Sequence, residues 1–177
     1  MPIDVLKLTD KELENLMENH RRNGATNLPI YMDAMRELEN RKGGGLEFDK
    51  SYNLILEAAR DGRFISYKEL ADGSGADWSK VHYSLGAHLW KLVKYADLKG
   101  WPMLSAIVVN KPNVSSGKME PNTLKGFIRA ACELGYEVIN DEAFLKEQQD
   151  RVFAWAKQHH RRTPARPAAN TLPRESN

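Results

Sequence analysis

The side chains with the clearest capacity for chemistry lie close together in the sequence, just after a short polar turn. Ser79, Lys80, His82 and Tyr83 follow Asp77, a residue type that caps helices well, so we expect them on the first two turns of a helix. Their hydroxyl, ammonium and imidazole groups can hydrogen-bond to phosphates or to the edges of bases. The pattern is compatible with contact to nucleic acid, but a helix face of this kind is usually just an ordinary solvent-facing surface.

Positive charge continues along the same predicted helix, residues 78–99. Lys91 and Lys94 follow Lys80 there, and four lysines stand against the single acidic residue Asp97, a local excess of three positive charges. Lysines on a helix attract the sugar-phosphate backbone electrostatically. Lys80, Lys91 and Lys94 are therefore candidate phosphate contacts.

A polar loop, residues 111–122, supplies the remaining candidates. Asn110 precedes it, and Lys111 and Lys118 lie in it, where they could reach a nucleic-acid backbone. Its Ser-Ser-Gly-Lys stretch is superficially similar to a nucleotide-binding loop, but residue 112 is proline where that motif requires glycine. We therefore expect no ATP or GTP site, and a plain surface loop is the alternative.

The sequence lacks recognisable metal-binding and catalytic signatures. His82 and His88 are six residues apart on one predicted helix and so lie on different faces, whereas metal ligands on a helix are spaced by three or four. The one cysteine, Cys132, lies on an apolar helix face, as a small hydrophobic residue would. We expect no metal, no cofactor and no enzyme, although a catalyst assembled from distant residues stays open.

Two of the four tryptophans, Trp90 and Trp101, do not fit the apolar stripes of their segments. Either could stack on a base or anchor a partner. Packing against the N-terminal helices is the alternative.

Apolar residues spaced by three and four predict a mostly helical chain. A run of three glycines, residues 43–45, marks a break. A short β-branched run predicts a strand at 104–110, and a second strand is expected at 136–139. The predicted helices cover residues 8–23, 28–42, 49–61, 67–72, 78–99, 123–134 and 141–157.

Charge and composition divide the 177 residues into three parts. Residues 1–45 form a predicted N-terminal helical arm, residues 46–157 a core with a C-terminal helix, and residues 158–177 a tail too poor in apolar residues to fold. The tail carries four arginines and one glutamate, so its charge of +3 leaves −1 for the rest of a chain whose total is +2. The basic character of the protein therefore belongs to the tail.

The composition also limits compartments and partners. Apolar residues make up 41% and charged residues 28% of the chain, as in ordinary soluble globular proteins. A single cysteine cannot form an intramolecular disulfide and suits a reducing compartment. No apolar run approaches the length of a membrane span, and the first residues do not follow the pattern of a signal peptide. We expect a cytoplasmic protein without membrane contact.

The order of elements between residues 50 and 110 is that of a winged helix-turn-helix. A short helix, a tight glycine-containing turn and a second helix form the helix-turn-helix, and the strand after them suggests a wing. The predicted fold class is α+β, predominantly α, with flanking N- and C-terminal helices around this core. Two helices and a turn also occur in many α-rich domains that bind no DNA.

The segments GRFISYKELADGSG, VHYSLGAHL and PMLSAIVVN resemble the C-terminal domain of alkylguanine-DNA alkyltransferases and alkyltransferase-like proteins. The resemblance covers about residues 50–135 and is strongest in the Ser-Tyr-x-x-Leu-Ala element at residues 66–71. It implies a winged helix-turn-helix that binds DNA through the minor groove and flips a base. Tyr67 then takes the position of the family's phosphate-contacting tyrosine, and a half-buried packing role is its alternative.

Two departures from the family's motifs exclude the family's alkyl-transfer reaction from this chain. The reactive cysteine of the Pro-Cys-His-Arg motif has no counterpart in the segment Pro-Met-Leu-Ser at residues 102–105, and the base-displacing arginine aligns with Tyr83. The resemblance therefore implies DNA binding without alkyl transfer.

Three functions remain open. The first is non-catalytic binding of duplex DNA, which would bring Lys80, Lys91 and Lys94 onto one face with Lys111. The second is a protein-interaction module or a non-catalytic subunit of a larger complex, which the body charge of −1 favours. The third is an unrecognised enzyme, such as a nuclease subunit, which a deep pocket gathering Tyr67, His82 and acidic residues would favour.

Overall fold

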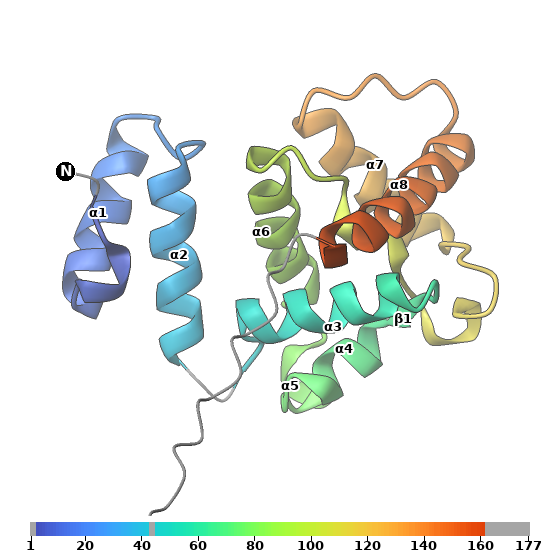
Figure 1. The fold of residues 1–177 in the computed structure, drawn as a ribbon, viewed down its shortest axis with the longest axis horizontal. Helices are drawn as coiled ribbons and strands as arrows, with labels where there is room; N and C mark the ends of the chain where they lie inside the picture. Colours follow the sequence, from blue (N-terminus) through green and yellow to red (C-terminus); the bar gives the residue numbers. More distant parts are fainter. Residues whose placement is uncertain (1–2, 43–44, 162–177) are drawn as a thin grey trace, which may run out of the picture.

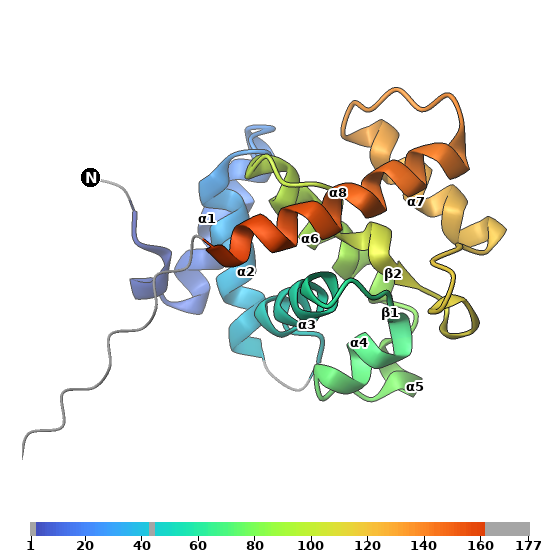
Figure 2. The same ribbon diagram turned by 45° about the vertical axis from the view of Figure 1, so that its right-hand side comes forward.

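The computed structural model describes residues 3–42 and 45–161. The chain is mostly helical with one small two-stranded sheet among the described residues, which confirms an α+β protein that is predominantly α. Figures 1 and 2 show α1 and α2 at one end of the molecule and α7 at the other, with α3 and α6 between them and α8 running from the α7 side back across the middle. The α-helices are α1 (Asp10–Arg22), α2 (Pro29–Lys42), α3 (Phe48–Arg60), α4 (Tyr67–Gly73), α5 (Trp78–Val81), α6 (Leu85–Leu98), α7 (Pro121–Glu133) and α8 (Asp141–Arg161). The strands are β1 (Ile65–Ser66) and β2 (Val108–Val109), and the 3-10 helices are η1 (Val5–Lys7), η2 (Leu104–Ile107) and η3 (Lys111–Asn113).

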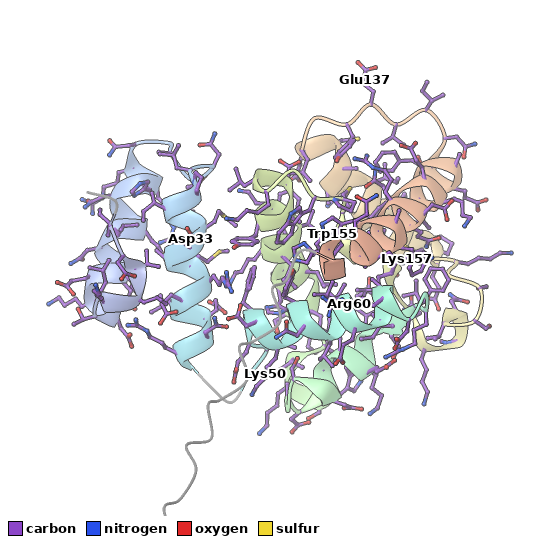
Figure 3. All side chains as sticks on the ribbon, viewed as in Figure 1. Asp33, Lys50, Arg60, Glu137, Trp155 and Lys157 are labelled. Atoms are coloured by element: carbon purple, nitrogen blue, oxygen red, sulfur yellow. The ribbon has the colours of Figure 1, made fainter. Side chains whose placement is uncertain are left out.

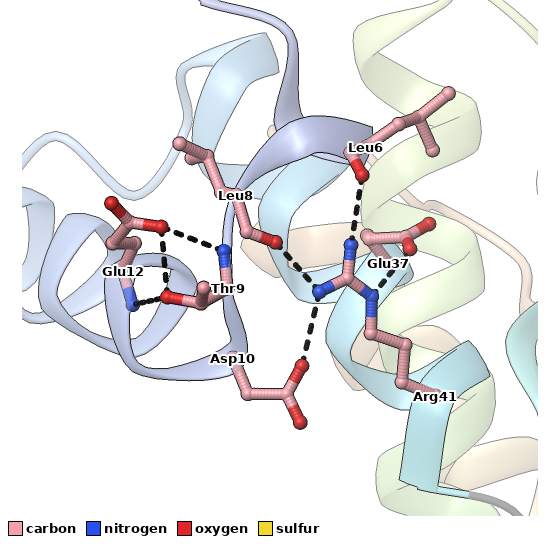
Figure 4. Close-up of polar contacts among 7 residues, drawn as sticks. All are labelled: Leu6, Leu8, Thr9, Asp10, Glu12, Glu37 and Arg41. Atoms are coloured by element: carbon pink, nitrogen blue, oxygen red, sulfur yellow. Dashed lines mark hydrogen bonds and ion pairs between the residues drawn. The ribbon is translucent and has the colours of Figure 1, made fainter.

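Arg41 on α2 ties the start of the chain to the helical hairpin of α1 and α2 (Figure 4). Its guanidinium donates to the carbonyl oxygens of Leu8 at 2.7 Å and Leu6 at 3.2 Å. It also pairs with Asp10 at 3.0 Å and with Glu37 at 2.6 Å. One side chain therefore fixes η1, the first turn of α1 and the last turns of α2 relative to one another.

A second arginine of α2 joins this hairpin to the rest of the molecule. Arg36 donates to the carboxylate of Asp49 on α3 at 2.7 Å and to the hydroxyl of Tyr95 on α6 at 3.0 Å. Its guanidinium also lies over the rings of Phe48 and Tyr95. Buried residues of α1 and α2 belong to the same hydrophobic core as those of α3, α6 and α8.

Helix α3 occupies the centre of that core. Ile55, Ala58 and Ala59 are completely buried, with α4 packed on one side and α8 on the other. An aromatic stack closes the α8 side, because Trp101 lies 5.8 Å from Tyr52 and 5.1 Å from Trp155, ring centre to ring centre. Figure 3 shows Trp155 near the middle of the molecule, where α8 passes α3.

A buried chain of polar side chains crosses the core between α3, α4 and α6. His88 Nε2 on α6 lies 2.8 Å from the Ser51 hydroxyl on α3, which lies 3.3 Å from the Ser74 hydroxyl at the end of α4. Ser74 in turn donates to the carbonyl oxygen of Leu70 at 2.8 Å. Burial, with the nearby charge of Lys91, lowers the pKa of His88 to about 4. His88 is therefore neutral near pH 7, and the chain sets the spacing of three helices.

Helix α8 holds the loop that follows β2. Gln149 is buried and donates through Nε2 to the carbonyl oxygens of Ala106, at 3.0 Å, and Gly117, at 2.7 Å. Gly117 has φ +72°, and its Cα packs so closely on Phe64 that a Cβ atom would lie 2.2 Å from the ring. The loop between β2 and α7 thus has a fixed position against the core.

Several predicted helix starts are confirmed, and one predicted helix is wrong. Thr9, Ser66 and Asp77 cap their helices as expected. The helix expected at 78–99 is two helices, because the backbone N–H and the hydroxyl of Ser84 both donate to the carbonyl oxygen of Val81 at 2.9 Å. This tight turn ends α5 and lets α6 start afresh at Leu85.

The strand predictions are largely wrong. Most of segment 104–110 is η2, and only Val108 and Val109 form a strand, paired in parallel with β1. The β-branched side chains of this run are completely buried. Their apolar character therefore reflects packing in the core and not an extended strand. Residues 136–139 form no strand, Ile139 is fully exposed, and Glu137 points away from the body (Figure 3).

The C-terminal boundary also differs from the prediction. Helix α8 continues to Arg161 instead of ending near Lys157, so residues 158–161 of the predicted disordered tail are helical. The remainder of that tail, residues 162–177, lies outside the described residues.

Acid is expected to destabilise the protein through His88. Its pKa is about 4 in the folded chain and about 6.5 when unfolded, so the unfolded state binds the proton more readily. The free energy of unfolding should therefore be highest above pH 6.5 and fall by about 3 kcal/mol as the pH drops to 4. Urea unfolding at pH 7.5, 6, 5 and 4.5 measures this, and the non-titrating variant His88→Gln should show a shallower fall. Equal slopes in the two proteins would contradict this role of His88.

Replacement of Gly117 by alanine is expected to lower the free energy of unfolding by about 2–4 kcal/mol, because left-handed strain and a clash with Phe64 add together. Gly62→Ala is the matched control: Gly62 has φ +67°, but no atom lies within 4 Å of its built Cβ. That variant should lose only about 1–2 kcal/mol. Urea unfolding of both variants tests the difference, and equal losses would rule out the close contact with Phe64.

Candidate functional site

A cavity of about 720 Å³ lies between α6 and α7. Leu89, Trp90 and Val93 of α6 form one wall, and Phe127 and Ala130 of α7 belong to the opposite one. Helices α4 and α5, η2 and the residues after β2 complete its lining. The volume is in the range of sites that enclose small molecules.

Three polar side chains line this cavity with hydrogen-bonding capacity to spare. The hydroxyl groups of Tyr67 and Ser105 have no hydrogen-bond partner among the described residues. Burial raises the pKa of Tyr67, so its phenol stays neutral. The Asn110 carbonyl oxygen accepts a hydrogen bond from the Thr123 hydroxyl at 3.1 Å, which leaves the Asn110 amide N–H groups for another partner. These groups together present hydrogen-bond donors without a charge.

The segment from Asp77 to Tyr83 forms an exposed tip beside the cavity. Its backbone is fixed by Asp77, whose carboxylate accepts from the N–H of Ser79 at 3.0 Å and from its hydroxyl at 2.7 Å. These hydrogen bonds lower the pKa of Asp77. Tyr83 is 90% exposed, and its ring lies 3.8 Å from that of His82, which in turn lies 5.6 Å from the ring of Trp78.

The structure divides the predicted site residues of this tip between two sides. His82 lines the cavity together with Tyr67 and Asn110, as does Trp78. Ser79, Lys80 and Tyr83 are exposed to solvent and are not part of the cavity lining. This two-sided arrangement is possible because α5 is a single turn and the chain turns again at Ser84 before α6 begins.

The predicted lysine contacts do not all gather on one face. Lys91 turns toward the N-terminal hairpin, where it pairs with Glu39 of α2 at 3.1 Å. It lines a separate cavity of about 460 Å³ between α1, α2 and α6. Lys94 instead lies 5.7 Å from the centre of the Trp90 ring, beside the first cavity.

Lys111 and Lys118 are exposed in the loop after β2. Each neighbours a residue of the cavity lining, because Asn110 precedes Lys111 and Met119 follows Lys118. Lys80 is also exposed, and its contact with Asp77 is long, at 3.8 Å. Lys80, Lys94, Lys111 and Lys118 lie on elements that border the cavity. Lys91 is also on α6, but its side chain pairs with Glu39 and lines the second cavity instead.

Sequence reasoning did not identify several residues of the cavity. Ser105, Phe127, Arg129 and Glu133 line it, although no motif or spacing marks them, because they come from segments far apart in the chain. Trp90 and Trp101 were the two tryptophans that fit no apolar stripe in the sequence. Trp90 lines the cavity, and Trp101 packs in the aromatic stack. A glycine inside α7, Gly126, was the one local sign of an open helix face there.

Within residues 3–42 and 45–161, no group of three or more histidine, cysteine, aspartate or glutamate side chains is placed to hold a metal ion. None of the helices in these ranges combines the length and apolar character needed to span a bilayer.

No protein-family model, no curated protein and no solved structure matches the chain.

Proposed function

We propose that the protein binds duplex DNA through the tip formed by residues 77–83 and does not catalyse a reaction on it. The observation that carries this proposal is the accessibility of the tip. Lys80 has 80% of its side chain exposed and Tyr83 is 90% exposed, so neither the N-terminal hairpin nor α8 covers them. A protruding helix start with polar side chains is the part of a helix-turn-helix that enters a groove.

The distribution of lysines meets the expectation for DNA binding only in part, because Lys91 does not share a face with the others, and it changes the proposed residue set. Lys80 on the tip and Lys111 and Lys118 on the loop after β2 are exposed. Lys94 lies beside Trp90, a residue of the cavity between α6 and α7. Phosphate contacts from these four would position the protein on the duplex. Lys91 is no longer among the proposed phosphate contacts, because its charge is neutralised by the ion pair with Glu39.

The resemblance to alkyltransferase-like domains supports a winged helix-turn-helix arrangement. In that arrangement α4 and α5 are the two helices, and the loop between β2 and α7 takes the place of the wing. Tyr83, which aligns with the family's base-displacing arginine, is the most exposed aromatic residue of the tip. An aromatic side chain at that place can stack on a base.

A protein partner is the second candidate function. The −1 charge of residues 1–157 and the separation of Lys91 from the other lysines weaken the attraction to DNA. Trp78 and Tyr83, whose side chains are exposed in part or in full and contact the half-buried ring of His82 between them, are also of the residue types enriched at protein interfaces. An enzyme has weaker support: the cavity does gather Tyr67, His82 and Glu133, but no hydrogen bond joins the Ser105 hydroxyl to a base among the described residues.

Lys80→Ala is expected to weaken binding to a 20-base-pair duplex about threefold for every sequence tried, and to reduce the salt slope by about 1, because it removes one phosphate contact. Fluorescence anisotropy between 50 and 200 mM salt measures both quantities. Lys91→Ala is the matched control and should bind like the parent protein, since its partner is Glu39. Both proteins keep the basic tail, so their difference reports the tip alone. Equal affinities for the two variants, or no binding at 50 mM salt, would refute the proposed surface.

Tyr83→Ala is expected to weaken binding about tenfold by removal of a stacking ring, whereas Tyr83→Phe should stay within about twofold. The 90% exposed side chain makes little contribution to the core, so both variants should unfold at the same urea concentration as the parent. The anisotropy titration above provides the measurement. A loss of similar size in both variants, or none in either, would show that the ring does not stack.

A further inference from the structure

We propose that the cavity between α6 and α7 is a binding site for a neutral heteroaromatic small molecule with hydrogen-bond acceptors along one edge. The cavity has about 720 Å³, and sites of 300–1,000 Å³ typically enclose most of a drug-sized ligand. The proposal does not depend on DNA binding, because it rests on the interior of the cavity and not on the exposed lysines.

The walls favour a flat apolar ring. Trp90 and Phe127 offer aromatic surfaces, and Leu89, Val93 and Ala130 are apolar neighbours on the same two helices. Aromatic rings stack on such surfaces with favourable geometry. A flexible aliphatic chain would gain less from the two rings.

The polar side of the lining defines the edge of the ligand. Tyr67 and Ser105 each hold a hydroxyl without a partner among the described residues, and Asn110 has free amide N–H groups because Thr123 occupies its carbonyl oxygen. Acceptor atoms on a heteroaromatic ring would satisfy these donors. Since a polar group left unpaired away from water is costly, a ring without acceptors should bind less well.

The charges in the lining favour a neutral ligand. Its two ionised residues, Arg129 and Glu133, lie one turn apart on α7, are exposed and have opposite signs, so the lining residues themselves carry no net charge. His82 Nδ1 lies 2.8 Å from the carbonyl oxygen of Trp78, so that nitrogen carries its proton and Nε2 is left as an acceptor in the neutral ring. An anionic ligand would find in the lining only the charge of Arg129, which Glu133 offsets.

The test uses the full ¹⁵N-labelled chain, quinazolin-4-one as a neutral probe with ring acceptors, and 2-naphthoate as an anionic ring of similar size. The four tryptophans give separate indole signals, and only Trp78 and Trp90 line the cavity, whereas Trp101 and Trp155 stack elsewhere. Quinazolin-4-one should shift the Trp78 and Trp90 signals saturably at millimolar or lower concentration and leave the other two in place. 2-Naphthoate should bind at least about fivefold more weakly.

Two substitutions probe the cavity itself. Gly126→Phe should fill it and weaken quinazolin-4-one about tenfold or more, and Gly126→Ala is the matched control with affinity within about twofold. Gly126→Ala should not unfold the chain, because a Cβ at Gly126 meets no atom within 4 Å, and urea unfolding of Gly126→Phe checks that the larger side chain leaves the fold intact. Tyr67→Phe should weaken the probe about fivefold by removal of one donor.

Four results would overturn the proposal. Three of them are the absence of a saturable shift with quinazolin-4-one, equal shifts at Trp101 and Trp155, and unchanged affinity in Gly126→Phe. A fourth is a shift of the Trp90 signal that only a duplex with a mismatched base produces, since the ring would then come from DNA and not from a free small molecule.

Discussion

The buried contact between His88 and Ser51 is the constraint on which the arrangement of the site depends. It sits where α3, α4 and α6 meet, and Ser74 extends it to the end of α4. Polar groups removed from water are costly unless each finds a partner, so the three side chains fix one another. Because α4 carries Tyr67 and α6 carries Trp90, the same contact sets the distance between two walls of the cavity.

The tip and the cavity share the same short segment of chain. Trp78 and His82 face the cavity, whereas Ser79, Lys80 and Tyr83 face solvent. A single straight helix over residues 78–99 would carry these residues on one rigid rod with Lys91. The turn at Ser84 separates them, so a ligand in the cavity would touch the back of the surface that we propose for DNA.

The N-terminal hairpin affects function through charge as well as through packing. Arg36 fixes it to α3 and α6, and this position brings Glu39 to Lys91. The lysine excess that looks continuous in the sequence is thereby divided between two faces of α6. The exposed positive charge beside the cavity comes instead from the tip and from the loop after β2, which Gln149 holds in place.

The sequence by itself determined most of the helices and several of their caps, because helix periodicity and capping at Thr9, Ser66 and Asp77 are local properties. It also pointed to Tyr67, His82 and Asn110, which do meet in one cavity. Only the tertiary structure decided the rest, since it depends on contacts between distant segments. Only Val108 and Val109 of the buried run at residues 107–109 pair as a strand, and Lys91 forms an ion pair with Glu39. Ser105 of η2 and Phe127 of α7 line the same cavity. No local pattern records such contacts, because the chain brings these residues together only when its helices pack.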